Sequence, residues 1–135
     1  MSYPIEEIEG IGGSYGEKLK AAGINNTDNL LAEAASAPGR KALEEKCGIT
    51  SKLLLTWANR ADLMRIKGIG KQFSELLECS GVDTIKELRN RNAVNLAAKM
   101  AEVNAEKKLA KSTPNEAQAT EWIEAAKSME PMISH

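Results

Sequence analysis

Apolar residues recur along the chain at the three- and four-residue spacing of amphipathic helices. No β-branched run alternates with polar residues at a period of two, which would be the pattern of a strand. The clearest stretch covers residues 63–82, where an apolar stripe flanks a Gly-x-Gly turn and Gly81 ends the following helix. The chain is therefore predicted to be all-α, with about ten short helices. The stripe consists of Leu63, Ile66, Phe73, Leu76 and Leu77.

The same pattern occurs twice. Residues 8–15 match residues 66–73 at an offset of 58 (66 minus 8), and we call residues 8–13 the first glycine turn and residues 66–71 the second. Trp57 matches Trp122 at an offset of 65 (122 minus 57), so the second half is about seven residues longer. The repeat predicts a pseudo-twofold duplication. We expect one helical domain over residues 1–129, made of repeats 1–62 and 63–129, and a C-terminal tail over residues 130–135 that is frayed from Met132 onward.

Between the glycine turn and the tryptophan of each repeat, one residue inserted in the alignment of the repeats brings Thr27 onto Thr84 and Leu31 onto Leu88. Capping signals then set the expected helix starts, because Ser, Thr, Asp and Asn accept hydrogen bonds from first-turn N–H groups. Pro38 and Gly39 are expected to break a helix. The expected caps or first residues are Ser14, Thr27, Arg40, Thr50, Asp62, Thr84, Asn92, Asn104 and Thr113.

The second glycine turn is the strongest candidate for chemistry. A glycine turn that leads into a helix exposes backbone N–H groups at the positive end of the helix dipole, which suits an anion. Basic side chains here would add charge, and binding to phosphate would be salt-dependent and blind to base sequence. The candidate nucleic-acid-binding residues are Arg65, Lys67, Gly68, Gly70 and Lys71.

The first glycine turn is a weaker candidate. Three glutamates, Glu6, Glu7 and Glu9, lead into it, and no basic residue follows it. Like-sign charge repels phosphate, so this turn is expected to serve mainly as structure. Its candidate residues are Gly10, Gly12, Gly13 and Ser14.

Charge supports this ranking. The formal net charge is −1, a weak electrostatic footprint for a dedicated nucleic-acid binder. Residues 1–62 carry seven basic and nine acidic side chains, or −2, whereas residues 63–135 carry eleven and ten, or +1. If either half contacts phosphate, the second is favoured.

No enzyme is predicted. The chain has no phosphate-binding Walker loop, no metal-ligand spacing and no nucleophile with a partner base, so we expect no catalytic residue, metal or cofactor. The single histidine, His135, stands at the end of the chain. Cys47 and Cys79 are expected to be buried free thiols of a cytoplasmic protein. Trp57 and Trp122 are expected in the core rather than stacked on bases.

Together these features resemble a bacterial family of unknown function built from tandem helix-hairpin-helix repeats, sometimes labelled as predicted flap-endonuclease-like 5′ nucleases. The resemblance implies possible DNA binding. The metal-binding carboxylates that such nucleases need have no counterpart here, so nuclease activity is not carried over. The resemblance rests on Ile8-Glu9-Gly10-Ile11-Gly12, Arg65-Ile66-Lys67-Gly68-Ile69-Gly70 and residues 38–40, 48–50, 57–63, 81–84 and 122–123.

Two interpretations stay open. The first is non-catalytic, sequence-independent DNA binding through the second glycine turn. The second is a protein–protein interaction or scaffold module, with a protein partner or a homodimer, in which both turns only shape the fold. No membrane segment is expected, because no apolar run approaches 18 residues. Three expected helices over residues 27–61 separate the turns, so joint engagement of two DNA strands is not assumed.

Overall fold

The computed structural model describes residues 2–134, and within them the fold is all-α. It has eight α-helices and one short 3-10 helix, fewer than the ten expected; the one β-type contact described is an isolated bridge between Pro4 and Asn26. The elements are η1 (Ile5–Glu7), α1 (Gly13–Ala21), α2 (Thr27–Ala34), α3 (Ala37–Cys47), α4 (Ser51–Leu63), α5 (Lys71–Cys79), α6 (Ile85–Arg89), α7 (Ala93–Lys107) and α8 (Glu116–Lys127).

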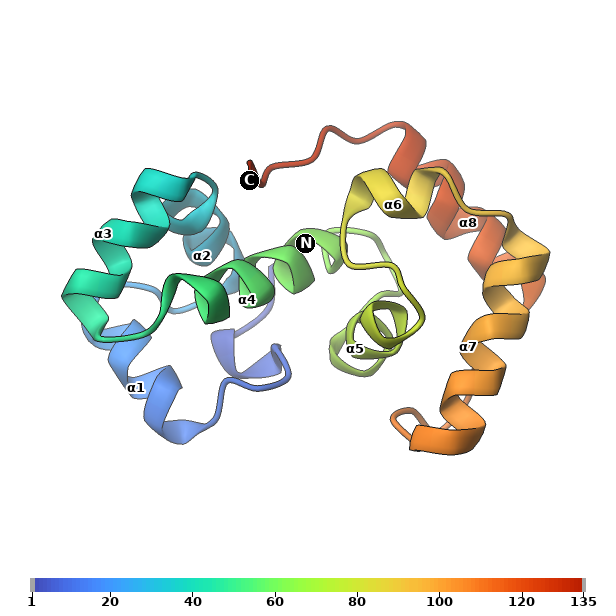
Figure 1. The fold of residues 1–135 in the computed structure, drawn as a ribbon, viewed down its shortest axis with the longest axis horizontal. Helices are drawn as coiled ribbons and strands as arrows, with labels where there is room; N and C mark the ends of the chain where they lie inside the picture. Colours follow the sequence, from blue (N-terminus) through green and yellow to red (C-terminus); the bar gives the residue numbers. More distant parts are fainter. Residues whose placement is uncertain (1, 135) are drawn as a thin grey trace.

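The helices surround two hydrophobic cores (Figure 1). Helices α1 to α4 enclose the first core and α5 to α8 enclose the second, with α4 lying between the two groups. At the end of α4, two consecutive side chains point into different cores. Leu63 belongs to the second core and Met64 to the first, and both are fully buried. Helix α4 and the turn after it therefore belong to both halves.

Each core contains one tryptophan beneath a glycine turn. Trp57 is 2% exposed and packs edge-on against Tyr15, with ring centroids 5.1 Å apart; Trp122 is 3% exposed and lies 5.2 Å from Phe73. Both tryptophans thus pack in the core, as expected. A Cβ atom on the glycine above, Gly10 or Gly68, would lie 3.1 Å from the indole Nε1 in either half. The same glycine–tryptophan contact is built twice.

The alignment of the two repeats after the glycine turns is simpler than expected. Asn26 caps α2 and Thr84 caps α6, so the offset remains 58 (84 minus 26) and no inserted residue is needed. Leu30 therefore corresponds to Leu88, and both side chains are fully buried. The pairing of Thr27 with Thr84 was wrong because it matched residue type instead of the cap position.

Several expected helix starts also differ. No side chain caps α1, so the expected Ser14 capping box is absent, and Asp62 lies in the last turn of α4. The final helix begins two residues later than expected, because its N-cap is Asn115 instead of Thr113, and Asn115 and Gln118 form a reciprocal capping box. Asn104 starts no helix, because α7 continues to Lys107 and the Asn104 side chain binds both backbone groups of Ala110.

Pro38 and Gly39 do not break a helix. Both lie in the first turn of α3, whose N-cap is Ser36. Proline is tolerated there because first-turn N–H groups have no intrahelical acceptor. At Gly39 a Cβ atom would approach the Glu33 carbonyl oxygen to 2.3 Å, so glycine permits the close approach of α2 and α3.

The C-terminal tail is ordered over residues 130–134, contrary to the expected fraying. It runs from the end of α8 back to the first half of the molecule (Figure 1), where Ile133 is buried in the first core. The Ser134 N–H donates to the Ala35 carbonyl at 2.8 Å, and the buried Arg40 donates to the Ser134 carbonyl at 2.7 Å. The expected fraying was wrong because it was based on the position of the tail at the chain end and not on the apolar side chain of Ile133. His135 lies outside the described residues.

Cys47 and Cys79 are both free thiols. Cys47 is half-buried, but Cys79 is exposed, so its expected burial was wrong. Within residues 2–134 no helix is long and apolar enough to cross a bilayer.

Candidate nucleic-acid interface

The second glycine turn connects the end of α4 to the start of α5. Gly68 has φ +94°, a conformation that side chains disfavour, and Gly70 is the N-cap of α5. Between them Ile69 is fully buried and anchors the turn to the second core. The sequence thus places both glycines at the surface of a turn whose centre is fixed.

The start of α5 is open. Among the α-helices of residues 2–134, a side chain caps six, and α1 and α5 are the two without such a cap. Both follow a glycine turn, and their N-caps are Gly12 and Gly70. The first N–H groups of a helix have no intrahelical acceptor, so these two ends present unpaired donors together with the positive end of the helix dipole.

The two lysines of the second turn are both exposed. Lys67 makes no ion pair in the described part of the chain, whereas the Lys71 ammonium lies 3.7 Å from the Glu9 carboxylate of the first turn. Both partners of this pair are 44% exposed. Exposed pairs contribute only about 0–1 kcal/mol, so an incoming anion could compete with Glu9 for Lys71 at little cost.

Arg65 is only partly exposed and is held by other residues of the chain. Its Nη1 lies 2.6 Å from the carboxylate of the buried Asp62, and it also donates to the Glu130 carbonyl at 3.1 Å. Asp62 in turn accepts a hydrogen bond from the Met132 N–H. The structure therefore brings Lys67, Gly68, Gly70 and Lys71 together, and it places Arg65 in a network that fixes the tail.

The first glycine turn has the same backbone but different charge. Gly10 has φ +97°, and Gly10, Gly12, Gly13 and Ser14 are all exposed. Here Arg60 of α4 donates through Nη1 to the Glu9 carbonyl. The candidate donors of this turn are accessible, but no lysine stands within it.

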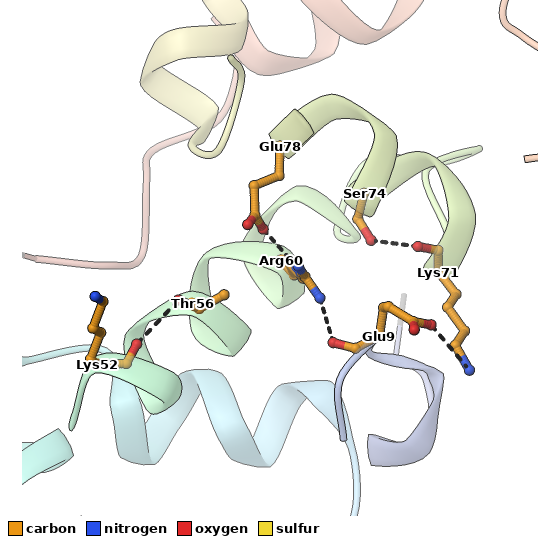
Figure 2. A network of polar contacts seen from close by, with 7 residues as sticks. All are labelled: Glu9, Lys52, Thr56, Arg60, Lys71, Ser74 and Glu78. Carbon is orange, nitrogen blue, oxygen red and sulfur yellow. Dashed lines mark hydrogen bonds and ion pairs between the residues drawn. The ribbon is translucent and has the colours of Figure 1, made fainter. Parts of the chain in front are cut away.

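Arg60 also joins the first glycine turn to α5 (Figure 2). Besides its bond to Glu9, its Nε lies 2.7 Å from the Glu78 carboxylate on α5. Sequence reasoning missed Arg60 and Glu78, because an arginine on one helix and a glutamate on another give no local pattern. The repeat offers the one usable signal: residue 60 is arginine, whereas its counterpart at offset 65 is Ala125.

Carboxylates gather beside this bridge. Burial raises the pKa of Glu75 above its ordinary value of 4.5, and the neighbouring charge of Glu9 raises it further. A carboxyl whose pKa is higher in the folded state takes up protons on folding, so its cost to stability is present at neutral pH and disappears as the pH falls below 4.5. The Lys71 side of the turn is therefore acidic as well as basic.

No group of three or more His, Cys, Asp or Glu side chains within residues 2–134 could hold a metal ion. The uncapped start of α5 can accept an anion through its backbone N–H groups. Neither the curated proteins nor the solved structures contain a match to this chain. Residues 9–129, which include all eight α-helices described, the second glycine turn and the first glycine turn from Glu9 onward, match one protein family over most of the chain. The chain thus belongs to the family described as the domain of unknown function DUF4332.

Proposed function

We propose that the chain is a non-catalytic DNA-binding protein that contacts the phosphate backbone through its second glycine turn. In this proposal both turns, each with its flanking helices, are helix-hairpin-helix elements. The N–H groups of Gly70 and Lys71 hold a phosphate oxygen, and the ammonium groups of Lys67 and Lys71 supply charge. Binding is independent of base sequence, because phosphate contacts carry no base identity.

The observation that carries this proposal is the uncapped start of α5 beside two exposed lysines. The other helix that follows a glycine turn, α1, is equally open but has glutamates before it. Six remaining helices of the described chain use a side chain to satisfy the same donors. An open end with positive charge is what an external anion requires.

A double variant, Lys67→Glu/Lys71→Glu, tests the site against single-stranded, double-stranded and forked DNA. We expect the native chain to bind with a Kd on the order of 10⁻⁴–10⁻⁶ M at physiological salt, to bind more tightly at low salt, and to lose binding in the variant. The measurement is fluorescence anisotropy of labelled DNA at two salt concentrations.

The matched control is Lys41→Glu/Lys46→Glu on α3, which makes the same change of charge at two exposed lysines in the other half of the molecule. It should retain binding. If both double variants weaken binding equally, general charge rather than the turn is responsible. An absence of binding at low salt up to about millimolar protein would contradict the proposal altogether.

A second candidate function, a protein-interaction module, is favoured by one observation. Glu9, Glu75 and Glu78 lie around Arg60 and Lys71, so the surroundings of the turn oppose phosphate. On this alternative the turns serve the fold alone. A homodimer that covered residues 68–71 would support it, and protection of their amides from hydrogen exchange at rising protein concentration would reveal such a dimer.

A further inference from the structure

A surface pocket of about 290 Å³ lies between the second glycine turn and α8. One wall is the backbone of the turn, and the other is a face of α8 that carries a carboxylate, an amide and the indole of Trp122. The proposed DNA contact does not use these α8 side chains. The lining residues are Ile66, Lys67, Gly68, Gln118, Glu121, Trp122 and Ala125.

The first half of the molecule shows what can fill such a site. There the corresponding wall is α4, and Arg60 extends over the first turn. Its Nη1 donates to the Glu9 carbonyl and would lie 3.7 Å from a Cβ atom on Gly10, while Trp57 Nε1 would lie 3.1 Å from the same atom. A guanidinium group therefore covers the glycine–tryptophan contact of the first half.

The second half has the same contact without the guanidinium. At the offset of 65, Ala125 replaces Arg60, and at the offset of 58, Lys67 replaces Glu9. Trp122 Nε1 would again lie 3.1 Å from a Cβ atom on Gly68. Within residues 2–134 neither the Lys67 carbonyl nor the Glu121 carboxylate has a hydrogen-bond partner.

We propose that this pocket accepts an arginine side chain from a partner protein, which takes the place that Arg60 holds in the first half. The guanidinium would donate to the Lys67 carbonyl, as Arg60 does to Glu9, and would pair with Glu121. Arginine suits the site better than lysine, because its planar group presents several donors at once and can serve a carbonyl and a carboxylate together. The Lys67 ammonium is exposed on a flexible stem and can turn to solvent.

A phosphate fits this pocket poorly. Glu121 and the Lys67 carbonyl are acceptors, and an anion placed between them would be repelled. The inference is thus independent of DNA binding, although both sites share Lys67 and Gly68. A guanidinium probe tests the pocket, and labelled DNA tests the phosphate site, so the two proposals can fail separately.

The experiment uses the two indole N–H signals in a ¹H–¹⁵N spectrum of the full chain, one from each tryptophan. The probe is N-acetyl-arginine methylamide, with N-acetyl-lysine methylamide as its comparison. We expect the arginine probe to shift the Trp122 signal in a saturable way, with a Kd on the order of 1–10 mM for so small a ligand, and to leave Trp57 unchanged. The lysine probe should bind at least several-fold more weakly.

Two variants complete the test. Ala125→Arg supplies the missing side chain from the chain itself and should abolish the shift; Glu121→Gln, on the exposed face of α8, should weaken it several-fold and leave the fold intact. The proposal is overturned if Trp122 does not respond, if Trp57 responds equally, or if both variants bind like the native chain. A Trp122 shift that appears on protein dilution without probe would assign the pocket to a second copy of this chain and would also overturn it.

Discussion

At the scale of single residues, the two glycines of the second turn have different tasks. Gly68 has a positive φ and lies against Trp122, whereas Gly70 has φ −109° and open space where a Cβ atom would be. The first is needed for the backbone conformation, and the second leaves the start of α5 without a side-chain cap. The sequence shows two equivalent glycines, and only their dihedral angles separate them.

Gly68→Ala should lower the free energy of unfolding by about 1–2 kcal/mol, because a left-handed conformation disfavours a side chain. Gly70→Ala should change it by less than about 0.5 kcal/mol, since nothing lies within 4 Å of the added atom. Urea denaturation followed by tryptophan fluorescence measures both. Equal effects of the two substitutions would contradict the assigned roles.

At the scale of elements, helix existence was largely predictable, and helix starts were less so. Apolar spacing identified the stretch that becomes α5, because Phe73, Leu76 and Leu77 of its stripe pack in the second core. The starts depend on which of several neighbouring polar residues reaches the first-turn N–H groups. At α8 the expected cap was Thr113, but Asn115, two residues further on, accepts the Gln118 N–H and forms the cap.

The stability contribution of an N-cap can be compared between α8, which has a side-chain cap, and α1, which has none. Asn115→Ala should cost about 1 kcal/mol of stability, because it removes the acceptor of the Gln118 N–H. Ser14→Ala should be close to neutral, since the Ser14 hydroxyl caps no helix. Thermal melting by circular dichroism resolves a difference of this size, and a similar loss in both variants would show that Ser14 stabilises α1 after all.

At the scale of the whole molecule, the repeat could not predict the contacts that join its two halves. Among them, the Arg60 bridge connects the first glycine turn to α5, and residues 130–134 connect α8 to the first core. Both include contacts between residues far apart in sequence, with 51 positions between Glu9 and Arg60 and 94 between Arg40 and Ser134, which periodicity does not report. For the candidate site, the sequence identified Lys67, Gly68, Gly70 and Lys71, but it could not show that Arg65 pairs with Asp62.

The tail contact predicts a long-range effect on the first half. Ile133→Ser should destabilise the protein by about 1.5–3 kcal/mol, because it removes a buried apolar side chain from the first core. Ile133→Val should cost only about 0.5–1.5 kcal/mol. Hydrogen exchange should locate the loss in α2 and α3, and protection that falls equally across α7 would contradict a local role for the tail.

The ordered tail also affects the choice of fragment for study. The family match ends at residue 129, so a fragment cut at that boundary would lack Ile133 and would uncover apolar surface beside Arg40. Exposed apolar patches promote association. Such a fragment would self-associate for reasons unrelated to the native protein and would mimic the homodimer considered above, and a bulky affinity tag fused after residue 134 would press on the same contact. Experiments on oligomeric state therefore require the chain through Ser134, with any tag placed at the other end.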